Sequence, residues 1–144
     1  MSDPIEAVMA SEVTIASDVD VVTARQRGRE LAAELTFSRG DQTVIAAAIS
    51  EIARNILTYA GRGTVRMSIK HDGDRSAVVV VARDDGPGIA DITLAMRDGY
   101  STSGGLGVGL GGARQLMDEF ELISAVGEGT TITMRKWHPR VHAR

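Results

Sequence analysis

The sequence predicts a two-layer α/β sandwich, in which a mixed, largely antiparallel sheet carries helices on one face. Three observations favour this class. Apolar residues recur at helical spacing between 42 and 60, they alternate with polar residues from 63 onward, and the expected elements follow the order β-α-α-β-β-(α)-α-β-β. The length of 144 residues and the 43% apolar content are typical of one globular domain, expected over 1–144 with a core at about 13–137.

The first half of the chain is expected to hold a strand and two helices. Alternation up to Ile15 predicts one or two short strand segments, and a helix should run from a cap cluster at 17–20 to near Phe37, weakened by Gly28. Asp41 is expected to cap a second helix over 42–60. Four residues of this helix fall within a narrow arc that faces the core: Ile45, Ile49, Ile52 and Ile56.

The second half is expected to hold four strands and two helices. Alternation over 63–70 predicts a strand with one wet face, and a hairpin turn at 71–74 leads into 77–82, whose unbroken apolar run predicts a strand buried on both faces. The remaining expected elements are a short helix over 91–96, a third helix over 106–120, strands over 121–126 and 131–137, and a frayed tail over 138–144.

Composition excludes several classes of function. A net charge of −3 gives no basic field for nucleic acid or anionic lipid, and an aromatic content of 3% leaves few stacking platforms for single strands. The absence of cysteine removes disulfides, thiol catalysis and cysteine-ligated metals. No apolar run approaches the roughly 20 residues that a membrane span needs, and the first residues do not resemble a signal peptide. We therefore expect a cytoplasmic protein without nucleic-acid or membrane partners.

A carboxylate and an amide lie four residues apart on the second predicted helix. Glu51 and Asn55 therefore project from one face, roughly 90–130° from the isoleucine arc, at the rim where the helix leaves the core. A carboxylate beside an amide oxygen can bind a hard cation, and asparagine is a poor choice within a helix unless its side chain has a role. Taken alone, the pair is also compatible with a solvated glutamate and a locally bonded asparagine.

The turn at 84–88, with the sequence DDGPG, follows the strand at 77–82 and matches D-x-G-x-G. Gly86 and Gly88 permit a sharp bend that brings a ligand close to the main chain. Asp84 can accept a hydrogen bond from an exocyclic amine such as that of adenine. The alternative is a simple strand-ending turn that aspartate initiates.

A glycine-rich segment, GGLGVGLGG, occupies 104–112. It matches G-x-G-x-x-G, but a loop precedes it where the dinucleotide fingerprint needs a strand, and the phosphate-loop pattern G-x-x-x-x-G-K-[ST] is absent. The segment is therefore expected to be a mobile loop that enters a helix N-terminus, where exposed N–H groups suit phosphates. The alternative is a flexible loop whose small residues allow close helix packing.

These segments occur in an order that resembles the nucleotide-binding fold of the GHKL superfamily, the Bergerat fold of gyrase B, the Hsp90 chaperone, sensor histidine kinases and MutL. The resemblance covers about 13–137 and rests on E-x-x-x-N in a helix, D-x-G-x-G after a strand, glycines before a helix, and Gly129-Thr130 before the last strand. It implies an ATP pocket between sheet and helices, closed by a lid.

The resemblance also implies a role for each matching residue. Asn55 is expected to bind Mg²⁺, and Glu51 occupies the position of the general base. Asp84 is expected to read adenine with the help of Thr130. The other residues implied to contact ATP line the pocket or belong to the lid: Gly86, Gly88, Gly105, Leu106, Gly107 and Gly109.

Length and local sequence favour one branch of the superfamily. Within these 144 residues we expect neither a phospho-acceptor hairpin nor a transducer domain, and neither H-R-D nor D-F-G of eukaryotic-type kinases occurs in them. The stretches ISEIARNILTYA, YSTSGGLGVGLGGARQLMDEFEL and GEGTTITMRKW look most like the stressosome switch-protein serine/threonine kinases. They look less like the related anti-sigma-factor kinases.

The resemblance implies a partner switch driven by Mg²⁺ and ATP. The expected substrates are STAS-domain scaffold or antagonist proteins of the stressosome, and phosphorylation would release the kinase to activate a downstream serine phosphatase in the general stress response. A homodimer is compatible with this role. Two alternatives stay open: an anti-sigma factor that sequesters a sigma factor while ATP mainly controls its conformation, and an ATPase fragment of a larger system.

Overall fold

The sheet contains five strands in the order β1-β2-β3-β5-β4, and every neighbouring pair is antiparallel. The computed structural model describes residues 10–96 and 109–138. β3 and β4 run in the same direction, but β5 lies between them. The predicted two-layer sandwich is therefore confirmed, with the described strands antiparallel throughout instead of mixed. The strands are β1 Ala10–Ile15, β2 Gly63–Asp72, β3 Arg75–Asp84, β4 Glu119–Ser124 and β5 Thr130–Trp137.

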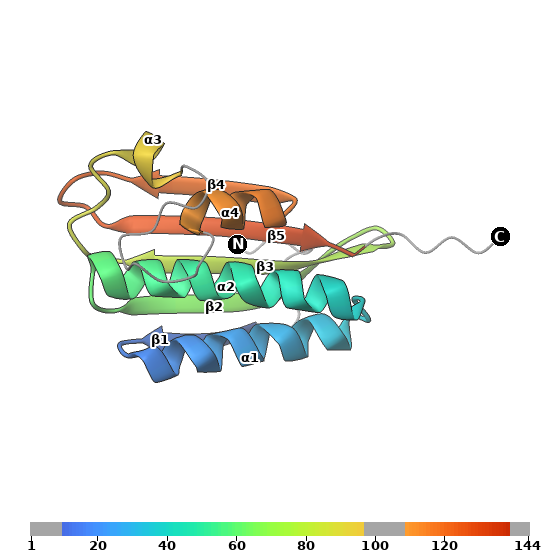
Figure 1. Cartoon of the computed structure of the whole chain (residues 1–144). Helices are drawn as coiled ribbons and strands as arrows, with labels where there is room; N and C mark the ends of the chain where they lie inside the picture. The colour runs from blue at the N-terminus through green and yellow to red at the C-terminus, as the bar shows by residue number, and fades with distance from the viewer. Residues whose placement is uncertain (1–9, 97–108, 139–144) are drawn as a thin grey trace, which may run out of the picture.

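Helices cover one face of this sheet (Figure 1). α1 (Asp18–Glu34) and α2 (Arg39–Tyr59) lie side by side, α4 (Gly109–Leu116) packs beside α2, and the short α3 (Ile92–Ala95) contacts α4. Apolar side chains between these helices and the sheet form the core. The isoleucine arc of α2 faces this core as predicted, and its members are 0–1% exposed: Ile45, Ile49, Ile52 and Ile56.

The opposite face of the sheet has no helix over it among the described elements. The expectation that residues 77–82 are buried on both faces is therefore wrong. Val78 and Val80 point into the core and are fully buried, whereas Val79 and Val81 are half-buried on the uncovered face. An unbroken apolar run indicates a strand but does not reveal how many layers cover it.

A serine precedes each of the two long helices. Before α1, the Asp20 carboxylate accepts a hydrogen bond from the Ser17 hydroxyl at 3.2 Å, in agreement with the predicted cap cluster. α2 starts at Arg39, earlier than predicted, because its N-cap is Ser38 and not Asp41. The Ser38 hydroxyl accepts the Asp41 N–H at 3.1 Å, and the Asp41 carboxylate lies in the first turn, where the helix dipole favours negative charge.

Gly28, expected to weaken the first helix, lies inside an unbroken α1 at its contact with α2. A Cβ atom at this position would collide with the side chain of Ile49, which is fully buried. The glycine thus allows the two helices to approach closely and gives up some helix propensity in exchange.

α4 is shorter than the helix predicted over 106–120. It ends at Leu116, because Glu119 and Phe120 already belong to β4 and pair with β5. Residues 106–108 of the predicted helix lie outside the described residues.

His138 is not the start of a frayed tail, contrary to the prediction. Its ring packs edge-on against Phe37 with 5.0 Å between the ring centroids, and its backbone N–H donates to the Ser76 carbonyl at 2.7 Å. The chain is therefore fixed to the body of the domain through residue 138, and residues 139–144 lie outside the described part. Within that part, no helix has the length and apolar character needed to cross a membrane.

Candidate functional site

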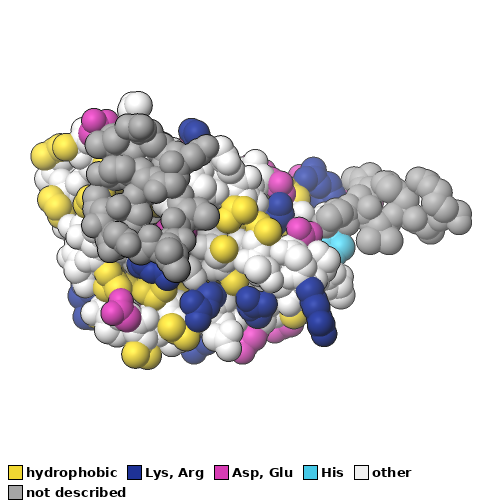
Figure 2. Space-filling view, viewed as in Figure 1, with side chains coloured by type: hydrophobic (Ala, Val, Ile, Leu, Met, Phe, Trp, Pro, Cys, Tyr) yellow, Lys and Arg dark blue, Asp and Glu magenta, His cyan; other side chains and the backbone are white. Residues whose placement is uncertain are grey.

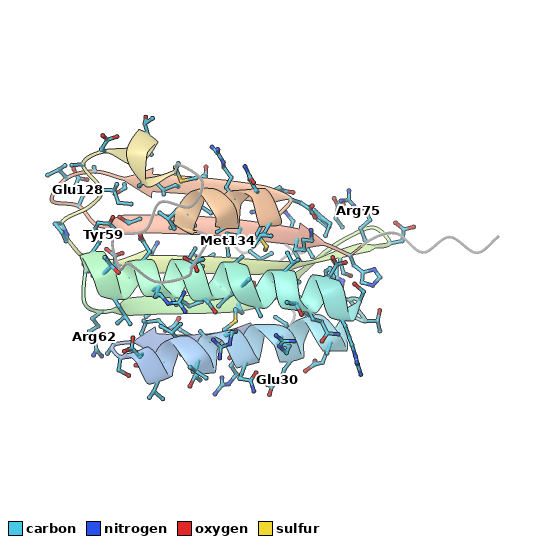
Figure 3. All side chains as sticks on the ribbon, in the orientation of Figure 1. Glu30, Tyr59, Arg62, Arg75, Glu128 and Met134 are labelled. Atoms are coloured by element: carbon cyan, nitrogen blue, oxygen red, sulfur yellow. The ribbon has the colours of Figure 1, made fainter. Side chains whose placement is uncertain are left out.

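Segments that are far apart in the sequence meet at one end of the molecule. The chain leaves α2 there, β3 ends at Asp84, and β5 begins at Thr130. In the sheet register, Asp84 lies opposite Gly63 on one side and Thr130 on the other. In Figure 3, the labelled Tyr59 and Glu128 lie at this end. Two predicted adenine-site residues, Asp84 and Thr130, are thus neighbours on adjacent strands.

The Asp84 carboxylate is buried, with 7% of the residue exposed. Its Oδ1 accepts a hydrogen bond from the Gly86 N–H at 2.9 Å, which holds the turn and orients the carboxylate. Its Oδ2 has no hydrogen-bond partner among the described residues. Oδ2 keeps its acceptor positions and is therefore suited to accept a hydrogen bond from a ligand amine.

The hydroxyl of Thr130 is joined to Ser124, which lies opposite it on β4. The two hydroxyl oxygens are 2.8 Å apart, and Ser124 Oγ also accepts the Ile89 N–H at 2.8 Å. These bonds connect β4 and β5 to the segment that follows the D-x-G-x-G turn. Sequence reasoning missed Ser124, because its position opposite Thr130 follows only from the strand register.

Both glycines of the turn are required by close packing against protein atoms. A Cβ atom on Gly86 would lie 2.5 Å from the Ala60 side chain at the end of α2. Gly88 has a φ of +81° and faces the backbone of Ala125, so a side chain there is both strained and blocked. These contacts explain the glycines structurally, and their contact with ATP stays a prediction.

A cavity with a volume of about 460 Å³ adjoins the turn. Its lining includes Ala60, Asp84 and Gly86, together with Arg62 before β2 and Arg83 on the uncovered face of the sheet. The volume lies within the usual range for small-molecule sites, roughly 300–1,000 Å³. The turn thus borders this cavity from one side, whereas Glu51, Asn55 and Thr130 do not line it.

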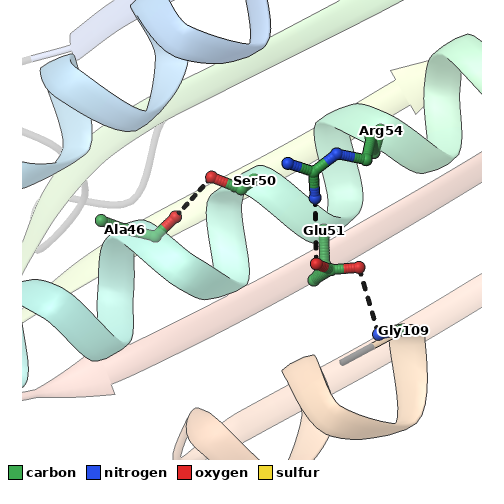
Figure 4. Close-up of polar contacts among 5 residues, drawn as sticks. All are labelled: Ala46, Ser50, Glu51, Arg54 and Gly109. Atoms are coloured by element: carbon green, nitrogen blue, oxygen red, sulfur yellow. Dashed lines mark hydrogen bonds and ion pairs between the residues drawn. The ribbon is translucent and has the colours of Figure 1, made fainter. Parts of the chain in front are cut away.

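Glu51 and Asn55 are both buried in α2, with 9% and 8% of each residue exposed. The alternative of a solvated glutamate is therefore wrong. Glu51 Oε1 accepts the backbone N–H of Gly109 at 3.1 Å, and Oε2 accepts Arg54 Nη1 at 3.0 Å (Figure 4). This ion pair was not predicted from the sequence, although Arg54 follows Glu51 by three residues, a spacing at which helix side chains can meet.

The donor set fits a magnesium ion bound together with a nucleotide. Asn55 offers an amide oxygen, and Mg²⁺ prefers oxygen ligands, but within 10–96 and 109–138 no group of three or more acidic or histidine side chains could hold a metal alone. Mg²⁺ commonly takes one or two protein oxygens and completes its shell with phosphates and water. Of the predicted lid residues, Gly109 starts α4, whereas Gly105, Leu106 and Gly107 lie outside the described residues.

This five-stranded sheet with its helical layer is the α/β sandwich of ATPase domains related to histidine kinases. The chain belongs to the histidine kinase-like ATPase domain family, whose model matches residues 15–136. A named relative is the serine/threonine-protein kinase RsbT of Bacillus subtilis (strain 168). It is 51% identical over 125 residues, which cover 87% of this chain and 94% of the relative.

Solved structures share the fold at lower identity. The structure of the RsbU and RsbW domains of Rv1364c from Mycobacterium tuberculosis matches with a TM-score of 0.61 and 21% identity, covering 95% of this chain and 35% of that chain. The SiaB-SiaC complex from Pseudomonas aeruginosa matches with a TM-score of 0.55 and 15% identity, covering 92% and 91%. At these identities the likeness establishes the fold.

Proposed function

We propose that the chain is a Mg²⁺- and ATP-dependent protein serine/threonine kinase that acts as a partner-switching regulator of the stress response. One observation carries this proposal: the chain is 51% identical to a serine/threonine-protein kinase across 94% of that relative. The presence of the buried polar residues Glu51, Asn55 and Asp84 at the positions that the resemblance assigns to the general base, the metal and adenine supports it.

Each side chain has a distinct proposed task. Asp84 accepts the amine of adenine through Oδ2, and Thr130 supports it from the adjacent strand. Asn55 is the protein ligand of Mg²⁺, which neutralises phosphate charge when bound. Glu51 orients the incoming serine hydroxyl and takes its proton, a contribution of about 10²–10⁴-fold. The other residues proposed to contact ATP lie along its base and phosphates: Gly86, Gly88, Gly105, Leu106, Gly107 and Gly109.

The proposed substrates are STAS-domain proteins of a stressosome scaffold or antagonist. Phosphorylation adds nearly two negative charges to the partner's serine, which weakens its complex with the kinase and frees the kinase for a downstream serine phosphatase. Lys and Arg side chains gather over α1 and α2 on the helical face (Figure 2). Release by phosphorylation requires that the phosphoserine does not lie against these cations, because they would attract it. We place this cycle in the cytoplasm, where ATP is supplied, and a homodimer is compatible with it.

A transfer assay tests the proposal. The protein is incubated with Mg²⁺, γ-labelled ATP and a STAS-domain protein, and in parallel with a sigma factor. We expect label on one serine of the STAS-domain protein, no label when that serine is alanine, and no stable sigma complex. Tight sigma binding without transfer would favour the alternative of an anti-sigma factor. ATP hydrolysis with neither outcome would favour an ATPase fragment.

A further inference from the structure

Both carboxylate oxygens of Glu51 are already bonded within the chain. Oε2 receives Nη1 of Arg54 at 3.0 Å, and Oε1 receives the N–H of Gly109 at 3.1 Å (Figure 4). The Arg54 side chain is 41% exposed, whereas that of Glu51 is 10% exposed, so the arginine reaches the buried carboxylate from the surface. A general base must place an oxygen beside the hydroxyl it deprotonates, and here each oxygen already accepts one bond from within the chain, which orients the carboxylate and lowers its basicity.

The Gly109 amide is a donor that an anion would compete for. Gly109 is the first residue of α4, and the first N–H groups of a helix have no acceptor within it. Gly109 has a φ of +73°, which glycine adopts readily, and in this conformation its amide N–H points toward Glu51. Helix N-termini bind carboxylates and phosphates by the same N–H groups, so a phosphate group could compete with Glu51 for this amide.

The bond between Arg54 and Glu51 lies within one helix, whereas the bond between the Gly109 amide and Glu51 joins two helices. Arg54 lies one turn after Glu51 on the same helix, so their contact does not depend on how α4 is placed. A guanidinium group forms a charge-assisted bond with a carboxylate and restrains its orientation. If the amide leaves Oε1, Arg54 still holds Oε2 and prevents the buried carboxylate from being left without a partner.

We propose that Arg54 is a positioning residue for Glu51, which exchanges the Gly109 amide for the substrate hydroxyl when a nucleotide phosphate takes that amide. This inference rests on the proposed kinase function. In the transfer step, Oε1 takes the hydroxyl proton as the serine oxygen bonds to the γ-phosphorus. The bond from that phosphorus to the β–γ bridging oxygen breaks, and ADP leaves with that electron pair. Arg54 touches neither substrate and acts through the carboxylate.

The kinetic test compares the wild-type chain with Arg54→Gln, Arg54→Lys and a matched control, Arg39→Gln. Arg39 is an exposed arginine on α2, about 18 Å along the axis from Glu51 at 1.5 Å per residue. Arg54→Gln should lower kcat about 10- to 100-fold with less than a twofold change in KM for ATP, because the base is misplaced. Arg54→Lys should recover part of this loss, since lysine keeps the charge without the planar group.

A raised KM with unchanged kcat, or a loss of kcat no larger than that of Arg39→Gln, would overturn the role of Arg54.

A second measurement needs no phosphoryl transfer. In ¹⁵N-labelled protein, the Gly109 amide resonance should differ between wild type and Glu51→Gln, because its acceptor changes from a carboxylate to a neutral amide. With Mg²⁺ and a non-hydrolysable ATP analogue, this difference should disappear.

Persistence of the difference in the nucleotide complex would overturn the exchange, because the amide would still be bonded to residue 51. If the difference disappears but wild-type protein transfers phosphate to no STAS-domain protein, the proposed kinase function fails while the exchange stands. If transfer occurs but Arg54→Gln matches the control, the positioning role fails while the kinase function stands.

Discussion

Asp84→Asn replaces one atom at the proposed adenine site and keeps the shape of the side chain. The substitution should have different effects at the two carboxylate oxygens, on stability at Oδ1 and on nucleotide binding at Oδ2. Oδ1 accepts the Gly86 N–H, and an asparagine oxygen can accept the same bond, so stability should change by less than about 1 kcal/mol. At Oδ2, an NH₂ group replaces an acceptor by a donor, which would then face the amine of adenine.

Nucleotide affinity should therefore fall while the fold is retained. A lost hydrogen bond to a charged group costs about 1.5–3 kcal/mol, which corresponds to about 10- to 150-fold in Kd. Isothermal titration calorimetry with Mg²⁺ and ADP measures this change, and urea unfolding checks the stability. Asp85→Asn is the matched control, because it removes the same charge from the exposed neighbouring residue. Its affinity should stay within about threefold of wild type.

A change of base makes the test sharper. Inosine nucleotides carry a carbonyl oxygen where adenine carries its amine, so Asp84→Asn should bind them better than it binds adenine nucleotides and reverse the wild-type preference. Unchanged ADP affinity in Asp84→Asn would refute the assignment of the adenine reader. Equal weakening by Asp85→Asn would show that overall charge, and not the hydrogen bond, governs binding.

The other predictions concern the helix pair, the base and the sheet edge. Asn55→Ala should lose Mg²⁺-dependent nucleotide binding and transfer together, whereas Glu51→Gln should still bind Mg²⁺ and ATP but transfer slowly; wild-type rates in Glu51→Gln would exclude it as the base. Gly28→Ala should lower the free energy of unfolding, measured in urea, by about 1 kcal/mol. The added methyl group overpacks the contact with Ile49 at a cost of roughly 1–3 kcal/mol, which outweighs a helix-propensity gain of about 1 kcal/mol. A stabilised variant would contradict the packing argument. A hydrogen bond from the Trp137 indole, together with a nearby arginine, lowers the pKa of Glu119 below its usual 4.5. The ionised Glu119 therefore stabilises the fold above that pH, and this stabilisation is lost as pH falls below it. Glu119→Gln should reduce the acid-dependent loss of stability in thermal unfolding, and an unchanged pH profile would argue against this role of Glu119.

The elements that could be predicted from sequence are those whose own periodicity decides their structure. The isoleucine arc of α2 repeats at helical spacing, and β2 alternates cleanly, so both were placed within a few residues. Boundaries were less certain where two signals compete. Ser38 and Asp41 are both good capping residues, and only the observed hydrogen bond shows that Ser38 takes the N-cap.

Contacts between distant segments could not be predicted in the same way. Glu119 and Phe120 continue the helical pattern of α4, but pairing with β5 places them in a strand. In the site, Glu51, Asn55 and Asp84 stood out because their residue types are unusual at those positions. Arg54 and Ser124 did not, because an arginine on a helix and a serine at a strand end are common, and their roles depend on where side chains meet in space.

Asp84 belongs to β3, which is hydrogen-bonded to a strand on each side, whereas Gly109 begins a helix of only eight residues. Amide groups in a central strand exchange with solvent through the rarest openings of a fold, and those at the end of a short helix through much more frequent ones. The two halves of the site therefore have different lifetimes. Under the proposed assignments, the contact of the base with β3 would open less often than the contact of the phosphates with the start of α4, so the phosphate end would be the first part of a bound nucleotide to be released.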